Sequence, residues 1–448
     1  MVEAADATDV AAVVRYAHTC GLAVATQPNG HGATPDLDGA ILLRTRRLNT
    51  LEIDTAARHA RVGAGVSSGS LQAAAAPHGL TGLNGSSPVV SVAGVALGGG
   101  LSWFGRKHGW VADHVTAFDI VDAEGRQRRL TADTDTDLFW ALRGGGGSFA
   151  IVTALELALH PAPHLYGGRM LWPIQHASEV MDAYRQITAP NDLTLWLDLL
   201  HFPGSEPMIA IDATYLGPAT TARALLSPLD HLPHPLTDSR RPMKITELGT
   251  ITAEPTDPGA GSSRGELLAD LDDRVARTLL AEPIAPLMSV QIRHLGGAFA
   301  LPSETPHGPL TEPYALYLFG VPTDPATAEA VTARQRALTD ALPISGRKPF
   351  TFLSLGETPA DAFTPAALNR LRGLKRHHDP HDTLRANFPI LSSTHPSVPR
   401  LQRDAIDTFS TTLDGPTSAG RQRRRPPSAD VAHFSPRHQR FEPSPVIP

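Results

Sequence analysis

Cysteine is almost absent from this chain of 448 residues, which has a single one at Cys20. One cysteine excludes an internal disulfide and any metal site made of several cysteines. Long apolar runs are absent as well, because none approaches the ~18 residues that a membrane-spanning helix requires, so we expect no membrane partner. The chain also lacks an excess of positive charge. Its formal net charge is −6, which gives no basis for predicting a nucleic-acid partner.

The start of the chain lacks the basic and apolar regions of a signal peptide, so we expect a cytoplasmic location. It opens on a helical pattern, with Thr8 as the expected N-cap and Gly21 just beyond the last turn. Cys20 falls on the apolar stripe of this helix, where we expect inert packing. A soluble domain rarely begins so abruptly, which leaves open the alternative that an upstream segment is missing.

Glycine is plentiful and gathers in three loops. They are residues 29–32 (NGHG), 85–103 (GSSPVVSVAGVALGGGLSW) and 143–149 (RGGGGSF). Residues 85–103 leave no room for an amphipathic helix, because almost nothing in them forms an apolar stripe. Such a glycine density either makes a shell of backbone N–H groups around a phosphorylated cofactor or forms a buried tight connection. Three such loops in one domain-sized stretch favour one large ligand.

A dinucleotide-binding fingerprint is present, but the predicted elements on either side of it are in the wrong order for a Rossmann fold. Gly145, Gly147 and Ala150 fit the pattern G-x-G-x-x-A. That pattern has a mechanical meaning only after a strand and at the start of a helix, whose N-terminus holds the pyrophosphate. Here the glycines follow a predicted helix at residues 135–142 and precede a predicted strand at residues 149–157. The sequence therefore argues against a Rossmann fold.

Several motifs together resemble the FAD-linked oxidases of the berberine-bridge-enzyme type, which have the vanillyl-alcohol-oxidase flavoprotein fold. These motifs are His31 in NGHG, residues 85–103, residues 112–115 (ADHV) and residues 137–153 (DLFWALRGGGGSFAIVT). The match runs nearly without gaps from about residue 10 to residue 161. A weaker match continues through residues 289–300 (SVQIRHLGGAFA) and 374–390 (LKRHHDPHDTLRANFPI).

The resemblance implies an α+β fold with two domains. Residues 1–162 would form a PCMH-type FAD-binding domain of two subdomains, and residues 163–358 a substrate domain on a large antiparallel sheet with helices. Residues 359–392 would return to the FAD domain. Residues 393–448 are rich in Ser, Thr, Pro and Arg and lack an apolar pattern, so we expect a disordered tail. The tail's basic run at residues 421–427 is typical of a solvated charge run.

The resemblance also implies which residues contact FAD. They are Asn29, Gly30, His31, Gly32, Ser86, Ser87, Ser91, Val92, Gly94, Asp113, Ile151, Val152 and Asn387. In similar enzymes the histidine at the position of His31 is covalently bound to the 8α carbon of the flavin, which makes the flavin a stronger oxidant. Many relatives add a cysteinyl bond, but Ser87 stands at that position. We therefore expect covalent attachment through His31 alone.

The chain departs from the family pattern at three points. Pro28 removes one backbone donor that would face the pyrophosphate, and Ser91 stands where a glycine is common. Many relatives carry a Y-x-N stretch, whose tyrosine abstracts a hydroxyl proton, and the matching residues here are Pro349 and Thr351. Phe350 between them cannot act as a base. The catalytic base is therefore unknown.

The middle of the chain is predicted from its own pattern to mix strands and helices. Strand-like stretches lie at residues 168–173, 193–202, 208–215, 287–300, 314–321 and 349–355, and helical ones near residues 176–187, 220–226, 265–281 and 325–342. Alternate residues of a strand point the same way, so Gln291 and Arg293 share one face. In relatives the corresponding positions line the substrate pocket. The alternative is a solvated or salt-bridged face.

Together these observations predict an FAD-dependent oxidoreductase acting on a small-molecule substrate. It would oxidise an alcohol, a sugar hydroxyl or a related C–H bond by hydride transfer to flavin N5, with O2 as the reoxidant. One alternative is a flavin-binding or structural relic without turnover, favoured by Pro28 and by the missing Y-x-N. Another is a nucleic-acid-binding protein acting through the tail, which the acidic remainder of the chain disfavours.

Overall fold

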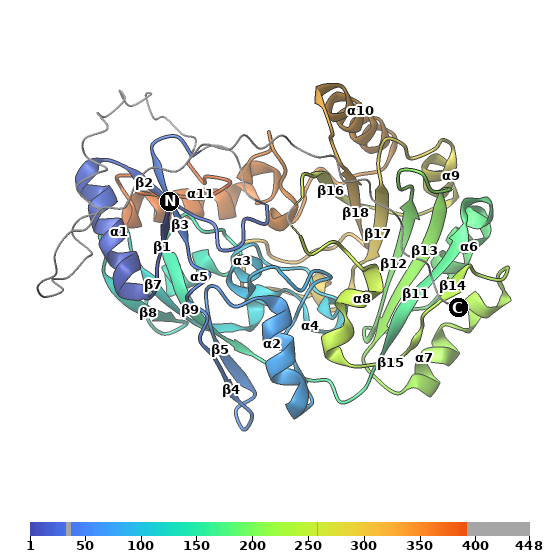
Figure 1. Ribbon diagram of the computed structural model, residues 1–448, viewed down its shortest axis with the longest axis horizontal. Coiled ribbons are helices and arrows are strands. Elements are labelled where there is room, and N and C mark those ends of the chain that lie inside the picture. The colour runs from blue at the N-terminus through green and yellow to red at the C-terminus, as the bar shows by residue number, and fades with distance from the viewer. Residues whose placement is uncertain (33–36, 258, 392–448) are drawn as a thin grey trace, which may run out of the picture. The chain divides into compact units, whose positions relative to one another are not determined.

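The computed structural model describes residues 1–32, 37–257 and 259–391, and the stretch Met1–Thr394 forms one compact unit. The predicted tail at residues 393–448 lies outside the described residues. Helices and mainly antiparallel sheets are both present, which confirms the predicted α+β class (Figure 1). Within the described ranges, no helix is both long and apolar enough to cross a membrane.

The first part of the chain contains two larger sheets, a two-stranded sheet of β6 and β10, and helices around them. Its strands are β1 (Val2–Glu3), β2 (Ala23–Thr26), β3 (Ala40–Arg44), β4 (Leu51–Asp54), β5 (His59–Gly63), β6 (Leu80–Thr81), β7 (Val115–Val121), β8 (Gln127–Thr131), β9 (Ile151–Ala158) and β10 (His160–Pro161). Its helices are α1 (Ala7–Cys20), α2 (Ser68–Ala75), α3 (Val92–Leu97), α4 (Gly105–His108) and α5 (Thr136–Leu142). The predicted border after residue 162 falls between β10 and the next strand.

The two larger sheets of this part differ in strand direction. In one, the strands run parallel in the order β1-β3-β2-β19, and β19 (Leu384–Arg385) comes from the C-terminal segment. In the other, the strands are antiparallel in the order β4-β5-β9-β7-β8. Both sheets contribute to one apolar core, which also takes in α1 and the buried side of α5. The glycine-rich loops extend from the elements of this core.

The second part is built on one long antiparallel sheet. Its strands are β11 (Leu165–Pro173), β12 (Leu193–Leu200), β13 (Met208–Tyr215), β14 (Thr237–Asp238), β15 (Arg241–Met243), β16 (Ser262–Leu268), β17 (Ser289–His294) and β18 (Tyr314–Gly320). They are ordered β14-β11-β13-β12-β17-β18-β16, and β15 pairs with β11. Its helices are α6 (Ala177–Gln186), α7 (Ala219–Leu225), α8 (Gly249–Thr252), α9 (Asp273–Leu280) and α10 (Pro325–Ala341).

The two faces of this sheet have different partners. Leu195 and Leu197 of β12, with Val290 and Ile292 of β17, belong to a core shared with α6, α9 and α10, which lie along one side of the sheet (Figure 1). Successive side chains of a strand alternate between faces. Trp196 accordingly points the other way and packs with the core of the first part. One face of the sheet is thus turned toward the glycine-rich loops.

Three predictions of local structure were wrong. Residues 85–103 contain the helix α3, which needs no apolar stripe because it is short, rich in alanine and capped by Ser91, whose Oγ accepts from the Gly94 amide at 2.9 Å. The first residues of the predicted helix at 265–281 belong to β16, because they pair with β18. Residues 349–355 form no strand. Pro349, with φ −59°, instead starts a single turn of 3₁₀ helix at Phe350–Phe352.

The expectations for α1 also need correction. Its N-cap is Asp6, whose carboxylate accepts from the amides of Thr8 and Asp9, while Gly21 ends the helix with φ +65° as expected. An ionised carboxylate suits the positive end of a helix better than a threonine hydroxyl. Cys20, the last residue of α1, is half-buried rather than on the buried stripe.

A buried lysine holds the C-terminal segment in place. Lys375 lies in α11 (Pro365–His378), and its Nζ donates to the Asp379 carboxylate at 2.6 Å. The same atom donates to the Ser148 carbonyl in the third glycine loop at 2.9 Å and to the Leu384 carbonyl of β19 at 2.7 Å. One ammonium group therefore joins the helix, the strand and the loop.

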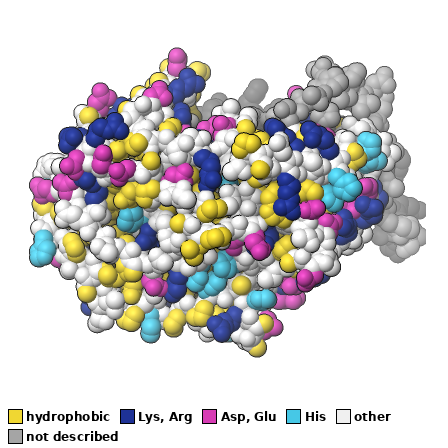
Figure 2. All heavy atoms as spheres, turned by 180° about the vertical axis from the view of Figure 1, so that it is seen from behind, with side chains coloured by type: hydrophobic (Ala, Val, Ile, Leu, Met, Phe, Trp, Pro, Cys, Tyr) yellow, Lys and Arg dark blue, Asp and Glu magenta, His cyan; other side chains and the backbone are white. Residues whose placement is uncertain are grey.

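Charged side chains of both signs are interspersed over the surface. Figure 2 shows Lys, Arg, Asp and Glu side chains alternating across one face, with no large area of a single sign. A basic stripe of the kind that follows a nucleic-acid backbone is not visible on that face.

Candidate active site

The three glycine-rich loops come together in the structure. Asn29 donates from Nδ2 to the Val89 carbonyl at 2.5 Å, which links the first loop to the second. The Gly146 amide donates to the Leu97 carbonyl at 2.8 Å, which links the third loop to the second. The loops are therefore neighbours, as a single large ligand requires.

The glycines of these loops serve two different purposes. Gly100 and Gly144 have φ values of +80° and +102°, and a Cβ on either would approach neighbouring atoms to 3.2 Å or less. These positions need glycine for packing, as the tight-connection alternative holds. At Gly32 a Cβ would meet nothing within 4 Å, and Gly94 is exposed in α3. The backbone at Gly32 is therefore open to a ligand, whereas the Gly94 amide is already bonded to Ser91 Oγ.

The residues of the first loop that are predicted to contact FAD lie at the surface of the protein. Asn29, His31 and Gly32 are exposed, and Gly30 is half-buried, in the loop that follows β2. Asn387 donates from Nδ2 to the Gly32 carbonyl at 2.7 Å, so the C-terminal segment reaches this loop. Cys20 precedes β2, at the end of the strand opposite His31.

The residues of the second loop that are predicted to contact FAD are more buried than those of the first. Ser86 and Ser87 are half-buried, whereas Ser91 and Val92 are buried at the start of α3. The hydroxyl of Ser91 is used in capping α3. The departure from glycine at this position thus has a structural role of its own. Ser87 leaves the second loop without the thiol that a cysteinyl bond needs.

The remaining predicted FAD contacts before the C-terminal segment are less exposed than the first loop. They are Asp113, which is half-buried, and Ile151 and Val152, which are buried. Ser303 donates from Oγ to Asp113 Oδ1 at 2.9 Å, and the Arg143 guanidinium lies 3.6 Å from the same atom. Burial raises the pKa of Asp113, and the Ser303 hydrogen bond opposes this effect. Ile151 and Val152 begin β9 with their side chains in the core, so only their backbone can meet a cofactor.

Arg44 is a cation beside the first loop that the sequence analysis missed. It ends β3, and its Nη1 donates to the Gln27 carbonyl at 3.0 Å. The same atom lies 3.3 Å from the position that a Cβ on Gly30 would take. Its position follows from the register of β2 with β3, in which Thr26 pairs with Leu43, just before Arg44. A basic residue at the end of a strand beside a glycine-rich loop was the available signal.

The segment that stands where relatives carry Y-x-N lies on the second and third loops. Thr351 is exposed, and its Cβ is 3.4 Å from the position of a Cβ on Gly98. The Phe350 ring packs against Gly146, and the Phe350 amide donates to His307 Nε2 at 2.8 Å. Burial lowers the pKa of His307 to about 3, which keeps its ring neutral and able to accept this bond.

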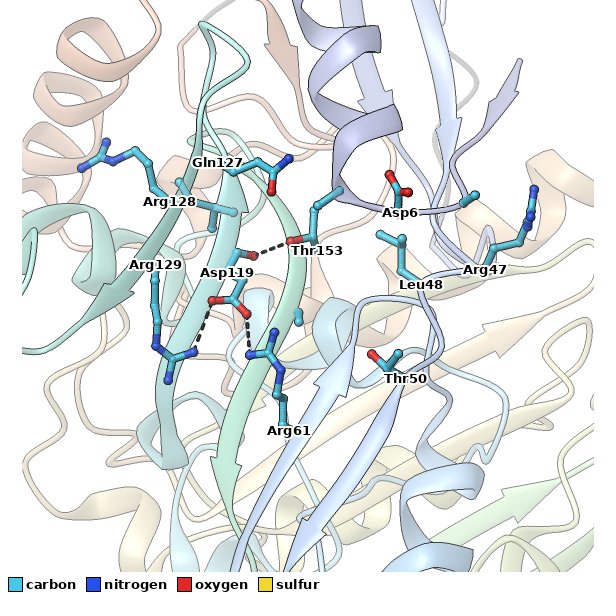
Figure 3. A pocket seen from close by; sticks show the side chains of 14 residues that line it. Asp6, Arg47, Leu48, Thr50, Arg61, Asp119, Gln127, Arg128, Arg129 and Thr153 are labelled. Carbon is cyan, nitrogen blue, oxygen red and sulfur yellow. Dashed lines mark hydrogen bonds and ion pairs between the residues drawn. The ribbon is translucent and has the colours of Figure 1, made fainter. Parts of the chain in front are cut away.

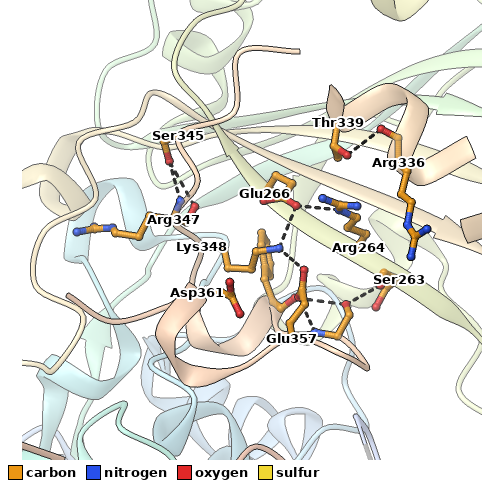
Figure 4. Close-up of polar contacts among 12 residues, drawn as sticks. Ser263, Arg264, Glu266, Arg336, Thr339, Ser345, Arg347, Lys348, Glu357 and Asp361 are labelled. Atoms are coloured by element: carbon orange, nitrogen blue, oxygen red, sulfur yellow. Dashed lines mark hydrogen bonds and ion pairs between the residues drawn. The ribbon is translucent and has the colours of Figure 1, made fainter. Parts of the chain in front are cut away.

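A second buried lysine anchors that segment to the sheet (Figure 4). Lys348 Nζ lies 3.0 Å from the carboxylate of Glu266 in β16 and 2.5 Å from that of Glu357. The Lys348 side chain is only 5% exposed. Ser354, at the other end of the segment, donates from Oγ to the Ser263 carbonyl at 2.6 Å. These contacts fix residues 349–352 between the sheet and the glycine loops.

The predicted substrate residues Gln291 and Arg293 do share a face, and that face is turned toward the second loop. Arg293 donates from Nη2 to Gln291 Oε1 at 2.6 Å, and its guanidinium lies 4.0 Å from the centre of the Trp196 ring. Trp196 in turn stacks on Trp103 of the second loop with 3.8 Å between ring centres. The sheet face thus meets the loop through two aromatic rings.

Two buried carboxylates on the same face were also missed. Arg169 of β11 pairs with Asp212 at 2.6 Å and with Asp198 at 2.7 Å, and both carboxylates are fully buried. Burial, together with the neighbouring charge of Asp212, raises the pKa of Asp198 well above its usual range. The signal was one acid in each of two otherwise apolar strands.

Comparison with known proteins agrees with this geometry. Residues 1–131 match the model of the FAD binding domain family. The chain is 29% identical over 410 residues to (R)-6-hydroxynicotine oxidase of Paenarthrobacter nicotinovorans, covering 86% of this chain and 89% of that protein. The structure of 6-hydroxy-D-nicotine oxidase from Arthrobacter nicotinovorans matches with a TM-score of 0.73 at 25% identity, over 86% of this chain and 90% of that one. These matches confirm the predicted resemblance to the FAD-linked oxidases of the berberine-bridge-enzyme type.

The fold of this chain is shared more widely than its sequence. BBE-like 1 of Physcomitrella patens matches with a TM-score of 0.76 at 19% identity, over 88% of this chain and 91% of that one. The predictions of FAD as cofactor and of an FAD-dependent oxidoreductase are thereby confirmed. The roles of the individual site residues stay predictions.

The residues of the glycine-rich loops fit an FAD. The open backbone at Gly32 allows close approach, and the Arg44 cation suits a pyrophosphate. No acidic side chain occurs in residues 27–32 or 85–103 to repel it. His31 is exposed in the first loop, as a covalent attachment point must be.

A cavity of about 520 Å³ lies elsewhere in the first part and is not this site (Figure 3). It is lined by residues near the start of α1 and by one face of β7, β8 and β9. Its central Asp119 is paired with Arg61 at 2.5 Å and with Arg129 at 3.2 Å. None of the glycine-rich loops contributes to its wall, so it lies apart from the flavin loops.

Proposed function

We propose that this enzyme oxidises a small molecule at an alcohol, a sugar hydroxyl or a related C–H bond. FAD, when bound, supplies the acceptor for the hydride, and O2 is the proposed reoxidant. The observation that supports this best is the stack of Trp196 on Trp103, which places the sheet face carrying Arg293 against the second glycine loop. A substrate held on that face lies beside the loops proposed to hold the cofactor.

We assign the holding of FAD mainly to the first loop. The backbone of Gly30 and Gly32 and the guanidinium of Arg44 would bind the pyrophosphate, and His31 would carry the covalent bond. Asn387 fixes this loop through its hydrogen bond to Gly32. Pro28 lacks an N–H, so Arg44 offers the charge that offsets this missing donor.

The chain's own residues also shape the substrate side. The rings of Trp103, Trp196 and Phe352 exclude water, which strengthens any charge interaction made there. Gln291 orients the Arg293 guanidinium through Oε1. Pro349 and Phe350 have no group that accepts a proton. The hydroxyl proton must therefore leave through a group other than a Y-x-N tyrosine.

The visible absorption spectrum of the purified protein is the first test. A colourless protein that added FAD does not reconstitute would contradict the cofactor assignment. Anaerobic mixing with a panel of alcohols and sugars should bleach the flavin band, and admitted air should restore it. A protein that holds FAD but is bleached by none of the panel would support the relic without turnover, which the missing base favours. A bleached protein that stays bleached in air would contradict O2 as the reoxidant.

A further inference from the structure

Arg293 carries a positive charge that no carboxylate of the described residues neutralises by direct pairing. Its Nε and Nη2 both donate to one neutral atom, Gln291 Oε1, at 3.1 and 2.6 Å. Burial lowers the pKa of Arg293, since the guanidinium has lost water. A guanidinium offers five N–H donors in a planar fork, and this one uses only part of them.

The carboxylates that act electrostatically on Arg293 do not pair with it directly. Asp198 and Asp212 both pair with Arg169, at 2.7 and 2.6 Å. Glu254 acts on Arg293 from beyond ion-pair distance. The fork of Arg293 is therefore free to accept a further anion.

Aromatic rings surround this cation. Its guanidinium lies 4.0 Å from the centre of the Trp196 ring, 5.0 Å from that of Tyr317 and 5.9 Å from that of Phe352. Ring faces of this kind attract a cation and pack well against an apolar body. A molecule entering here meets an apolar wall with one positive charge on it.

Resting on the proposed function, we propose that Arg293 binds a carboxylate of the substrate, whose apolar or aromatic body packs on the half-buried ring of Tyr317. The substrate class is then a hydroxylated acid with an apolar body, not a neutral sugar or a cationic amine. A planar guanidinium binds a carboxylate with two parallel hydrogen bonds, which fixes the orientation of the substrate as well as its charge.

Benzoate and its neutral analogue benzamide test this inference without turnover. Each is titrated into the flavin-loaded enzyme, and binding is followed by the change in the visible flavin spectrum. Benzoate should bind at least about tenfold more tightly than benzamide, as expected for a hydrogen bond to a charged group. Arg293→Gln should remove this preference, and Arg293→Lys should keep part of it.

Arg223→Gln is the matched control. Arg223 is an exposed arginine in α7 whose guanidinium lies 5.9 Å from the centre of the Tyr166 ring, in the same part of the chain. This variant should keep the preference for benzoate. Flavin content is measured for every variant. If Arg293→Gln fails to fold, the comparison of the two probes in the unaltered enzyme and in Arg293→Lys still decides.

Equal affinity for the two probes, no binding of benzoate, or a preference that survives in Arg293→Gln would each overturn the inference. These results are distinct from failure of the proposed function. An enzyme bleached equally well by neutral and acidic alcohols would retain the function and lose the inference. An enzyme that prefers benzoate but is never bleached would retain the carboxylate site and lose turnover.

Discussion

Substitution of Lys375 tests how its ammonium group holds the C-terminal segment on the flavin loops. Its side chain is 2% exposed, and the Asp379 carboxylate that it contacts at 2.6 Å is fully buried. Lys375→Met keeps the length of the side chain and removes the charge. Asp379 would keep its hydrogen bonds from the Thr383 and Leu384 amides but lose its cation.

The expected loss can be worked from these contacts. Removing one partner of a buried ion pair costs about 3–5 kcal/mol, and the two amides that remain on Asp379 place the value near the lower end. Two carbonyls, those of Ser148 and Leu384, also lose their donor. A loss of about 3 kcal/mol is a large part of the ~5–15 kcal/mol that stabilises a typical domain.

Urea unfolding followed by circular dichroism measures this loss, and the flavin released is measured in parallel. Arg376→Met is the control, because Arg376 is an exposed cation next to Lys375 on the same helix. It should change the free energy of unfolding by less than about 0.5 kcal/mol. Lys375→Met with Asp379→Leu should recover part of the stability, because no buried charge is then left unpaired. A loss below about 1 kcal/mol for Lys375→Met alone would refute the reasoning.

Three further predictions concern the flavin loops and the histidines. His31→Ala should release its FAD on acid denaturation, whereas the unaltered protein keeps it; intact mass without a flavin increment in the unaltered protein would contradict the covalent bond. Gly144→Ala should lower stability by about 1–3 kcal/mol because of its φ of +102°, and unchanged urea unfolding would contradict this. Burial lowers the pKa of His108 to about 4 and of His160 to about 3. Because these values lie below the unfolded value of about 6.5, stability should fall as pH drops from about 6.5 toward 4, by up to about 1.4 kcal/mol per pH unit for each histidine. Urea unfolding at pH 7 and pH 5 measures this, and His160→Phe should reduce the slope.

Local patterns predicted those elements whose residues alternate or repeat clearly. The strand β13 has the predicted bounds, residues 208–215, because a short, mainly apolar run is a property of the segment itself. β16 was taken for a helix, because what makes it a strand is its pairing with β18, about fifty residues later in the chain. Such a partner leaves no mark on the local pattern.

The residues of the candidate site can likewise be divided into those that local patterns predicted and those that they missed. The loop around His31 and the shared face of Gln291 and Arg293 were predicted, because glycine spacing and strand alternation are local. Arg44 and Lys348 were missed, because their positions follow from strand register and from a buried network that joins distant segments. The Trp103–Trp196 stack, which joins loop to sheet, likewise exists only after folding.

The pairing of the strand β19 has a consequence for folding of the chain during its synthesis on the ribosome. It pairs Leu384 with Val24, and Asn387 beside it fastens the loop of His31 through Gly32. The edge of the first sheet at β2 therefore stays unpaired until nearly 400 residues have been synthesised. Contacts so far apart in sequence form late and slowly. A nascent chain should thus acquire a firmly held flavin only after its synthesis has passed β19, the last strand of the described residues, which pairs with a strand near the start of the chain.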